Sequence, residues 1–479
     1  MRTNSSGRLI AVSMILILGT VSPSFAQDAA PGSQGSGGQG SAAPGSQGTP
    51  SAGSEISPTG EYKEGLALGG WMLAPELFLG AVYNDNRNQL NNGGDTGTSL
   101  RVSPRIVGYH DAGMNKTSVY GVMDGQFFNS NTIAATAGVT NSYQPWDDLL
   151  LNGFFNYTRE TSLFNSALNF NNNAIGPPGT PSAGIPIILN PFGTTPTVNP
   201  IAYNQFTGGG SINKKFNDGF ASLGATAFYI LYDSQSNTIP LPFQTSNNAA
   251  SVWVQGRVGY HFLPGVYAFA EGDGIFQRFQ NSVFDTDGYR VTGGVGLDDP
   301  SSLLRGEIYA GYQAQQQLAN QVFVTSTAPI VTPPIVGPVV VPTGISTHES
   351  SGVFGARLNY YPTEYSTWIL QIDQTLGVTT ALSPLVPQGT PSKVTTAILQ
   401  TNYALSRDWW LGLRVGYTQG WFFNFAPENQ GWLAGASFNY TISRNILLTL
   451  DYQYTQEHSV APNTTFTQSQ ITAGLTYRY

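Results

Sequence analysis

Few side chains of this 479-residue chain are suited to acid–base or nucleophilic chemistry. It has no cysteine and only four histidines: His110, His261, His348 and His458. We expect His261 on a strand, His110 in a short turn, and the other two in outer loops. His458 has the best position for catalysis, because Asp451 and Glu457 are near it in sequence. A hydrolytic site also needs a nucleophile and an orienting residue, and no such set accompanies His458, so we predict that the protein is not an enzyme.

Ligands for a metal or a cofactor are equally sparse. Without thiols the chain can form no disulfide and no zinc–thiolate site. Segment 84–95 carries several oxygen ligands that suit Ca²⁺, but its spacing matches no EF-hand loop, and turns rich in Asn and Asp are common. Gly208–Gly210 follows no strand–helix pattern, so it predicts strand curvature rather than a phosphate-binding loop. We expect neither a cofactor nor a bound metal.

The composition indicates a lipid-facing protein. The chain has 20 basic and 28 acidic side chains, which gives a formal net charge of −8. Such a protein lacks the basic face that follows phosphates, so we expect no nucleic-acid partner. Only 10% of the residues are charged, whereas 12% are aromatic. This combination is typical of a protein whose outer wall contacts membrane lipid.

Residues 1–26 have the features of a secretory signal peptide. Two arginines precede a short apolar run, and Ser24-Phe25-Ala26 supplies the small residues of a cleavage site. The apolar run is shorter than the roughly 20 residues that a membrane-spanning helix needs. Residues 27–64 are rich in Gly, Ser, Pro and Gln, and they predict a disordered linker. The third part of the chain, residues 65–479, carries the fold.

From about Trp71 the sequence alternates between apolar and polar residues. In the last ten residues Ile471, Leu475, Tyr477 and Tyr479 share one face, while Gly, Thr and Arg478 occupy the other. An alternation of this length, apolar outward and polar inward, is the signature of a transmembrane β-strand. Fourteen segments show it clearly, and four more are less regular: 72–83, 132–143, 205–216 and 393–404.

The connections alternate between short and long. Short turns such as 217–218, 263–265 and 443–445 separate longer loops, as in outer-membrane barrels with tight periplasmic turns. The expected fold is therefore all-β, a transmembrane antiparallel β-barrel of about 18 strands, with about 16 as the alternative. An even count puts both ends of the barrel in the periplasm. A soluble β-sandwich or β-helix would expose charges on the face that is apolar here.

The beginning of this region resembles a known family. Pro75-Glu76-Leu77 leads to Tyr83-Asn84-Asp85-Asn86, and the next strand carries Ser103-Pro104. These motifs resemble the start of the putative beta-barrel porin type-two family of Gram-negative outer-membrane proteins, and the architectural likeness extends from about Gly65 to Tyr479. The resemblance implies an integral barrel of the outer membrane, with some members associated with exopolysaccharide or capsule export. It implies no catalytic residues.

The chain end resembles a second known feature. Ile471, Leu475, Tyr477 and the terminal Tyr479 are similar to the signal by which the barrel-assembly machinery recognises its clients. The expected partners are therefore this machinery and the lipid of the outer membrane. Trimerisation, as in many porins, is a further alternative that these residues leave open.

Alternation assigns the charges of the barrel to its interior. We predict fourteen pore-lining candidates, eight positive and six negative: Arg101, Arg105, Asp124, Arg257, Glu271, Asp273, Arg290, Arg305, Glu307, Arg357, Asp373, Arg414, Asp451 and Arg478. Charges of both signs can create a transverse field that orients polar solutes, or they can pair across strands and keep the interior rigid. The sequence leaves both interpretations open. The near balance of signs predicts weak charge selectivity.

Aromatic residues and loops bear on the solute. Trp253, Tyr267, Phe269 and Trp410 fall on the inward face, where they could stack on sugar rings or pack within the lumen. The expected outer loops 163–204 and 317–349 are rich in proline, and residues 163–204 and 317–347 contain no charged side chain. These loops could narrow the mouth, contact a partner, or be disordered.

The leading functional hypothesis is a porin-like channel for passive diffusion of small polar solutes. An 18-stranded barrel is wide enough for an aqueous path unless loops fill it. One alternative is a conduit for secreted polysaccharide, which the family resemblance suggests. The other is a closed structural or adhesive barrel.

Overall fold

The computed structural model describes residues 65–86, 96–128, 132–162, 201–232, 249–279, 285–299, 301–318, 348–378, 391–423, 428–459 and 465–479. These residues belong to one compact unit, 39–479. The expected signal peptide (1–26) and linker (27–64) lie outside the described residues, as do 163–200 and 319–347 of the two uncharged loops. Within the ranges given above, no helix is long and apolar enough to cross a membrane.

The described residues form strands throughout. The strands are β1 (Leu66–Leu68), β2 (Trp71–Asn84), β3 (Gly97–Asp111), β4 (Asn115–Phe127), β5 (Thr132–Trp146), β6 (Leu149–Ser162), β7 (Ile201–Phe216), β8 (Gly219–Tyr232), β9 (Ala249–Leu263), β10 (Val266–Phe279), β11 (Thr286–Leu297), β12 (Leu304–Gln317), β13 (His348–Thr363), β14 (Ser366–Val378), β15 (Pro391–Ala404), β16 (Trp409–Phe422), β17 (Glu428–Ser443), β18 (Ile446–Ser459) and β19 (Phe466–Arg478). The four less regular segments are therefore strands β2, β5, β7 and β15.

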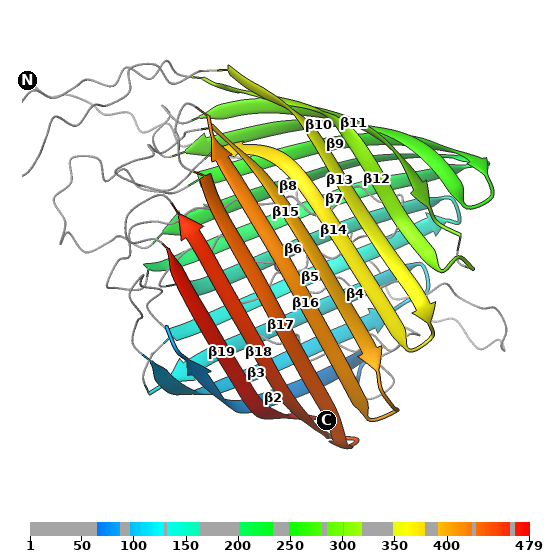
Figure 1. The fold of residues 1–479 in the computed structure, drawn as a ribbon. Helices are drawn as coiled ribbons and strands as arrows, with labels where there is room; N and C mark the ends of the chain where they lie inside the picture. Colours follow the sequence, from blue (N-terminus) through cyan, green and yellow to red (C-terminus); the bar gives the residue numbers. More distant parts are fainter. Residues whose placement is uncertain are drawn as a thin grey trace, which may run out of the picture. The chain divides into compact units, whose positions relative to one another are not determined.

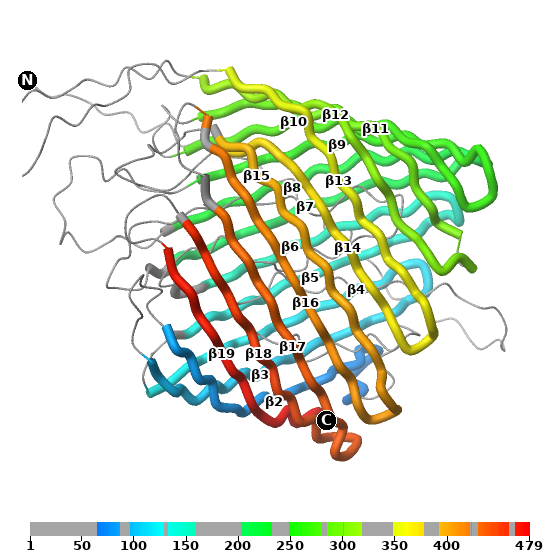
Figure 2. The backbone as a smooth tube through the Cα atoms, in the orientation of Figure 1, coloured from blue at the N-terminus to red at the C-terminus, as the bar shows by residue number. Residues whose placement is uncertain are grey.

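The strands from β2 to β19 form a closed antiparallel barrel (Figures 1 and 2). Each strand pairs with the next in the sequence, and β19 pairs with β2 from Gln470–Asn84 to Arg478–Glu76. The short strand β1 adds to β2 through three residue pairs and lies outside this count. The prediction of an 18-stranded barrel is confirmed. Closure removes the two exposed edges that an open sheet would present to lipid.

Exposure alternates along the strands as the sequence predicts. On β19 the side chains of Ile471, Leu475 and Tyr477 are 41–51% exposed, whereas Thr472 and Thr476 between them are at most 2% exposed. Apolar side chains thus cover the outer wall, where lipid replaces water, and polar side chains line the inner wall. All four residues of the expected assembly signal lie on the outer face.

Tight turns connect the strands at one end of the barrel, where the C-terminus also lies (Figure 1). One of these turns requires glycine. Gly265, between β9 and β10, has a φ of +71°, and a Cβ there would lie 2.4 Å from the Cβ of Asp299. The left-handed conformation and the close approach both exclude larger residues.

The strands are longer than a membrane span requires. Several residues that were expected in turns or loops therefore belong to strands. β2 to β19 contain 12 to 16 residues, because ladder hydrogen bonds continue beyond the apolar belt. His110 therefore lies in β3 rather than in a turn, and His458 lies in β18 rather than in a loop. His348 begins β13, Gln317 ends β12, and residues 201–204 belong to β7 rather than to the preceding loop.

Candidate functional site

The inner wall of the barrel is the candidate site. The fourteen predicted charges all lie at inward positions of their strands, between outward neighbours such as Ile106, Val258, Ile308 and Tyr477. Most of them are paired with one another. Their pairing favours the interpretation in which opposite charges neutralise each other across strands rather than forming a ring of one sign.

Seven of these charges form one network across six neighbouring strands, β9 to β14. We call it the β9–β14 network, and its charged members are Arg257, Glu271, Asp273, Arg290, Glu307, Arg357 and Asp373. All are less than 9% exposed. Charges so buried are stable only when they are paired and hydrogen-bonded.

Arg257 on β9 joins two carboxylates of this network. Its Nη2 donates to Glu307 Oε2 over 2.5 Å, and its Nη1 lies 3.5 Å from Glu271 Oε2. The guanidinium also lies over the ring of Phe269, with 3.6 Å from Cζ to the ring centroid. One arginine thus connects β9 with β10 and β12 through two ion pairs and a cation–π contact.

The remaining members extend the network on both sides. Arg290 Nε donates to Asp273 Oδ2 over 2.5 Å, and Arg290 Nη2 lies 3.3 Å from Glu271 Oε1. Arg357 Nη1 lies 3.7 Å from Glu307 Oε1. The last carboxylate, Asp373 on β14, accepts a 2.7 Å hydrogen bond from the hydroxyl of Tyr309. Opposite charges therefore alternate from Arg257 to Arg357, and Tyr309, whose ring centroid lies 5.7 Å from Arg357 Cζ, connects the network to Asp373 on β14.

Three further pairs lie on the other strands. Arg101 donates from Nε and Nη2 to the two oxygens of Asp124, each over 2.8 Å. Arg414 Nη2 donates to Asp451 Oδ1 over 3.1 Å. Glu76 lies 3.5 Å from Arg105 Nη1 and 3.3 Å from Arg478 Nε, so it links β2 to both of its neighbours. Glu76 is absent from the predicted pore-lining residues. It lies two residues before Phe78, so the alternation of β2 also assigns it to the inward face.

Arg305 differs from the other predicted charges. Its guanidinium lies over the ring of Tyr361, 5.0 Å from the centroid, and its Nε donates to the carbonyl of Ser302 over 3.4 Å. It is thus held at the turn end of β12 by an aromatic ring and a backbone carbonyl.

Two of the four predicted sugar-stacking residues are packed into the wall. Tyr267 is 0% exposed, and with Phe269 and Tyr309 it forms a buried cluster against which Phe220 packs. Trp253 lies under Arg290, with 5.6 Å from Cζ to the ring centroid, and Trp410 is half-buried. Stacking of a solute on Tyr267 would require this cluster to rearrange.

Glycines on neighbouring strands make room for these rings. A Cβ on Gly296 would lie 2.1 Å from the ring of Tyr267, and a Cβ on Gly355 would lie 2.3 Å from the ring of Tyr309. A Cβ on Gly259 would likewise lie 2.2 Å from the ring of Phe220. Each aromatic ring therefore lies flat across a glycine of the next strand, which explains why glycine is frequent in these strands despite its low strand propensity.

From β4 to β7 the inner wall bears hydroxyl and amide groups. Tyr120 donates to Asn156 Oδ1 over 2.5 Å, and the hydroxyls of Thr136 and Thr158 are 3.3 Å apart. Asn152 donates to Ser211 over 3.5 Å. This part of the wall can hydrogen-bond uncharged polar solutes or water without imposing a net charge.

Charged side chains also lie in the turns. Lys214 forms an ion pair with Asp148, and this hydrogen bond lowers the pKa of the Asp148 carboxyl below its usual range. In the turn before β12, the hydroxyl and backbone N–H of Ser301 donate to Asp299 and lower the pKa of its carboxyl. Both carboxylates are ionised at neutral pH, and both fix turn geometry.

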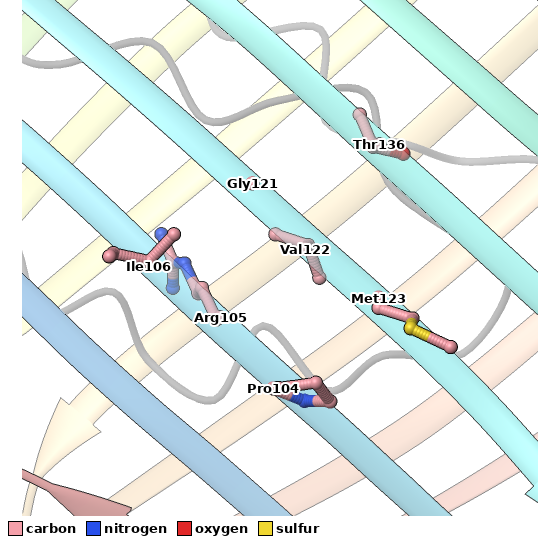
Figure 3. Close-up of a pocket in the computed structure, with 7 residues that line it drawn as sticks. All are labelled: Pro104, Arg105, Ile106, Gly121, Val122, Met123 and Thr136. Carbon is pink, nitrogen blue, oxygen red and sulfur yellow. The ribbon is translucent and has the colours of Figure 1, made fainter.

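A pocket lies in the wall between β3 and β4 (Figure 3). The ladder is interrupted there between Val102–Gly125 and Arg105–Val122, at the position of Pro104, which has no N–H to donate. The pocket measures about 330 Å³, and Ile106, Gly121 and Met123 lie along it together with Pro104. Its lining combines outward side chains such as Ile106 and Met123 with the inward Arg105 and Thr136.

The structure provides no support for the two chemical alternatives. His458 is exposed on β18, and its neighbour Glu457 points to the opposite face, since successive residues of a strand alternate. Of the expected calcium segment, residues 87–95 lie outside the described part. Asp85 accepts a 2.6 Å hydrogen bond from the backbone of Ser469, and Asn86 Nδ2 donates to the carbonyl of Thr467, so both hold β2 to β19. The described residues contain no cluster of three or more His, Asp or Glu side chains that could hold a metal.

The fold and its inner wall define an outer-membrane type of β-barrel. The family described as Putative beta-barrel porin 2 matches residues 62–331 and 349–479, so the chain belongs to this family. The expected family resemblance is thereby confirmed. Family membership places the protein among the porin-like barrels of the outer membrane.

Several solved structures are similar to this chain at low sequence identity. The siderophore receptor PirA from Acinetobacter baumannii is 7% identical, with 86% of this chain and 81% of that chain covered and a TM-score of 0.41. The outer membrane protein opdK from Pseudomonas aeruginosa is 8% identical, with coverage of 85% and 99% and a TM-score of 0.40. OpdL from the same organism is 9% identical, with coverage of 86% and 99% and a TM-score of 0.40. No curated protein matches the chain.

Proposed function

We propose that the protein is a non-enzymatic channel of the Gram-negative outer membrane, through which small polar solutes diffuse passively. The observation that supports this function most strongly is the inner wall, where polar side chains predominate and opposite charges are paired. A wall of this kind lowers the cost of moving a hydrated solute through a membrane without binding any single solute tightly. The signal peptide 1–26 would direct export, and both ends of the barrel would face the periplasm.

Charge pairing sets the expected selectivity. Selective pores usually carry rings of one sign, whereas here arginines and carboxylates alternate within the β9–β14 network and in the Arg101–Asp124 and Arg414–Asp451 pairs. We therefore expect ions of either sign to pass with similar permeability. Neutral solutes should be admitted according to their size.

The function is tested with the mature chain from residue 27, refolded in detergent and confirmed by a heat-modifiable gel shift. In liposome-swelling assays, the rate should fall smoothly from small to larger neutral sugars of a size series. Vesicles with heat-denatured protein are the control. A rate equal to that of the control for every solute would contradict the proposal and favour a closed structural or adhesive barrel.

A conduit for polysaccharide is the second candidate, favoured by the uncharged hydroxyl and amide groups of β4 to β7. Such a conduit should bind oligosaccharides, which would block its ion current. Trp253→Ala should relieve the block if this ring contacts the sugar, whereas Tyr267→Ala serves as a comparison because the Tyr267 ring is buried. A diffusion channel should show no long-lived block in either variant.

A further inference from the structure

The ladder between β13 and β14 is incomplete at the end of the barrel opposite the tight turns. β13 and β14 pair from Thr363–Ser366 to Gly355–Asp373, and there the pairing stops although both strands continue. In the same register, residues 350–354 would face residues 374–378. These two segments, which we call the seam, do not pair with each other. Their other edges are regular, since β13 pairs with β12 to Gln316–His348 and β14 pairs with β15 to Val378–Pro391.

Side chains from β12 hold the end of β14 instead. Gln313 Nε2 donates to the carbonyl of Leu376 over 2.9 Å, and the N–H of Leu376 donates to Gln313 Oε1 over 3.1 Å. Gln315 Nε2 donates to the carbonyl of Gly377 over 2.8 Å. The amide of Gln313 replaces the backbone partners that β13 would otherwise supply to Leu376, and the amide of Gln315 adds a bond to the next residue, Gly377.

These bonds show where the end of β14 lies. Gln313 is 0% exposed and points inward from β12, two strands away from β14 in the barrel. Its bonds with Leu376 therefore place the end of β14 on the inner side of β13. Figure 2 shows the corresponding ends of β13 and β14 diverging, whereas the other halves of the two strands run together.

The seam can part at low cost compared with the rest of the wall. Elsewhere, separating two strands in the membrane would leave a row of backbone groups without partners, which lipid cannot satisfy. Among the described residues of the seam the backbone ladder is absent, and hydrogen bonds of Gln313 and Gln315 hold the end of β14 to β12. The barrel thus has one built-in place for a lateral opening.

The chemistry on the two sides of the seam indicates what could pass. On the outer wall Phe354 and Tyr312 are 44% and 45% exposed, as expected for the aromatic edge of the lipid-facing belt. On the inner side lie the amides of Gln313 and Gln315 and the charged end of the β9–β14 network at Asp373. The acyl chains of the adjacent leaflet thus meet the seam at its Phe354 end, beyond which the outward positions of β13 are Gly352 and Ser350, and polar groups meet the inside.

We propose that the seam between β13 and β14 is a lateral gate through which a single-chain amphiphile reaches the lumen from the adjacent lipid leaflet. Its apolar chain would lie between the two strands, and its polar head would contact Gln313 and Gln315. The gate closes when the register of β13 and β14 extends past Gly355–Asp373. This function is separate from passive diffusion of polar solutes, and its test does not depend on ion conductance.

The first test measures entry of an amphiphile. Ser351→Cys, which lies inward on β13 in the seam, is labelled with bimane, and the protein is reconstituted in vesicles containing a doxyl-labelled lysophosphatidylcholine. Gln470→Cys, at an inward position of β19 away from the seam, is the matched control, and the absence of native cysteine makes both labels unique. We expect at least threefold stronger quenching at 351 than at 470. Equal quenching at the two positions would overturn the proposal.

The second test measures closure. The test variant carries Phe354→Cys and Gln374→Cys, which would face each other if the register of the ladder were extended. The control variant carries Ala356→Cys and Ile372→Cys, which replace a pair within the existing ladder. Both pairs should form a disulfide on oxidation, and added lysophosphatidylcholine should slow only the seam pair, by several-fold. A seam pair that never cross-links, or that cross-links equally fast with the amphiphile present, would contradict the gate. Single-channel conductance of the same preparations reports separately on the diffusion function.

Discussion

Arg257 shows how a single residue can stabilise several strands of the inner wall. Replacement by Met would leave the two buried carboxylates Glu271 and Glu307 with fewer cationic partners. Loss of one partner from a buried ion pair costs about 3–5 kcal/mol. We expect Arg257→Met to lower the free energy of unfolding by about 3 kcal/mol in a urea titration of the refolded barrel.

The control for this prediction is an exposed ion pair. Lys116 lies 3.6 Å from Asp111, and both side chains are more than 40% exposed. Exposed pairs contribute about 0–1 kcal/mol, so Lys116→Met should leave the urea midpoint almost unchanged. Similar losses for the two variants would show that the β9–β14 network does not stabilise the barrel.

The contact between Tyr267 and Gly296 gives a second prediction. A Cβ at position 296 would overlap the tyrosine ring, so Gly296→Ala should lower the temperature of the heat-modifiable gel shift. Gly272→Ala is the matched control, because a Cβ there meets nothing within 4 Å. Removal of the ring in the double variant Gly296→Ala, Tyr267→Ala should make the glycine substitution harmless. Equal effects of the two glycine substitutions would contradict this packing.

Selectivity should respond to a single carboxylate. Asp451→Asn removes the carboxylate partner of Arg414, whose side chain is 25% exposed to the lumen. The freed guanidinium should attract anions, so the reversal potential in a KCl gradient should shift toward that of chloride. Arg414→Gln with Asp451→Asn removes both charges and should restore the wild-type value. An unchanged reversal potential in the single variant would show that this pair lies away from the ion path.

The alternation of side chains was sufficient to predict which charges lie inward, but their partners could not be derived in this way. The partner of a side chain depends on strand register, and a shift by one residue would change every pair. The link from Arg257 to Glu307 crosses two intervening strands, so it depends on the curvature of the wall as well. The packing of Tyr267 across Gly296 was unpredictable for the same reason.

At the scale of the element, β19 is the strand that closes the barrel. Its outer face carries the expected assembly signal, and the N–H of the terminal Tyr479 donates to the carbonyl of Pro75 over 3.2 Å. We expect Tyr479→Ala to reduce the amount of folded barrel inserted into outer-membrane vesicles by several-fold. The readout is the heat-modifiable fraction in membranes isolated from expressing cells.

Tyr452→Ala is the matched control for this variant. Tyr452 is also an outward-facing tyrosine, 42% exposed on β18, but it lies far from the chain end. Its loss should leave the inserted fraction almost unchanged, and refolding of both variants in detergent should be equally efficient. A Tyr479→Ala variant that inserts like wild type would contradict the role of the chain end in assembly.

Strand existence was easier to predict than strand length. Alternation and turn residues identified each of the strands from β2 to β19, including the irregular segment that became β15. The alternation makes the strands too short at both ends. Hydrophobic patterning stops at the edge of the lipid, whereas the backbone ladder continues into water. The seam between β13 and β14 leaves no trace in alternation, since Phe354 and Gln374 keep the outward phase of their strands.

At the scale of the whole molecule, the barrel encloses a polar interior with paired charges behind an apolar outer wall. Outside the seam, the ladder satisfies the backbone in the membrane, and the pairing of charges keeps the interior polar without strong selection of one ionic sign. The central claim is that this interior forms a water-filled path for small solutes.

The most direct test is single-channel recording of the refolded chain from residue 27 in a planar bilayer. Stable steps on the order of a nanosiemens in 1 M KCl, with similar permeability for potassium and chloride, are the predicted result. Heat-denatured protein at the same concentration should give no steps. A barrel that folds, as its gel shift would show, but conducts no current would contradict the account.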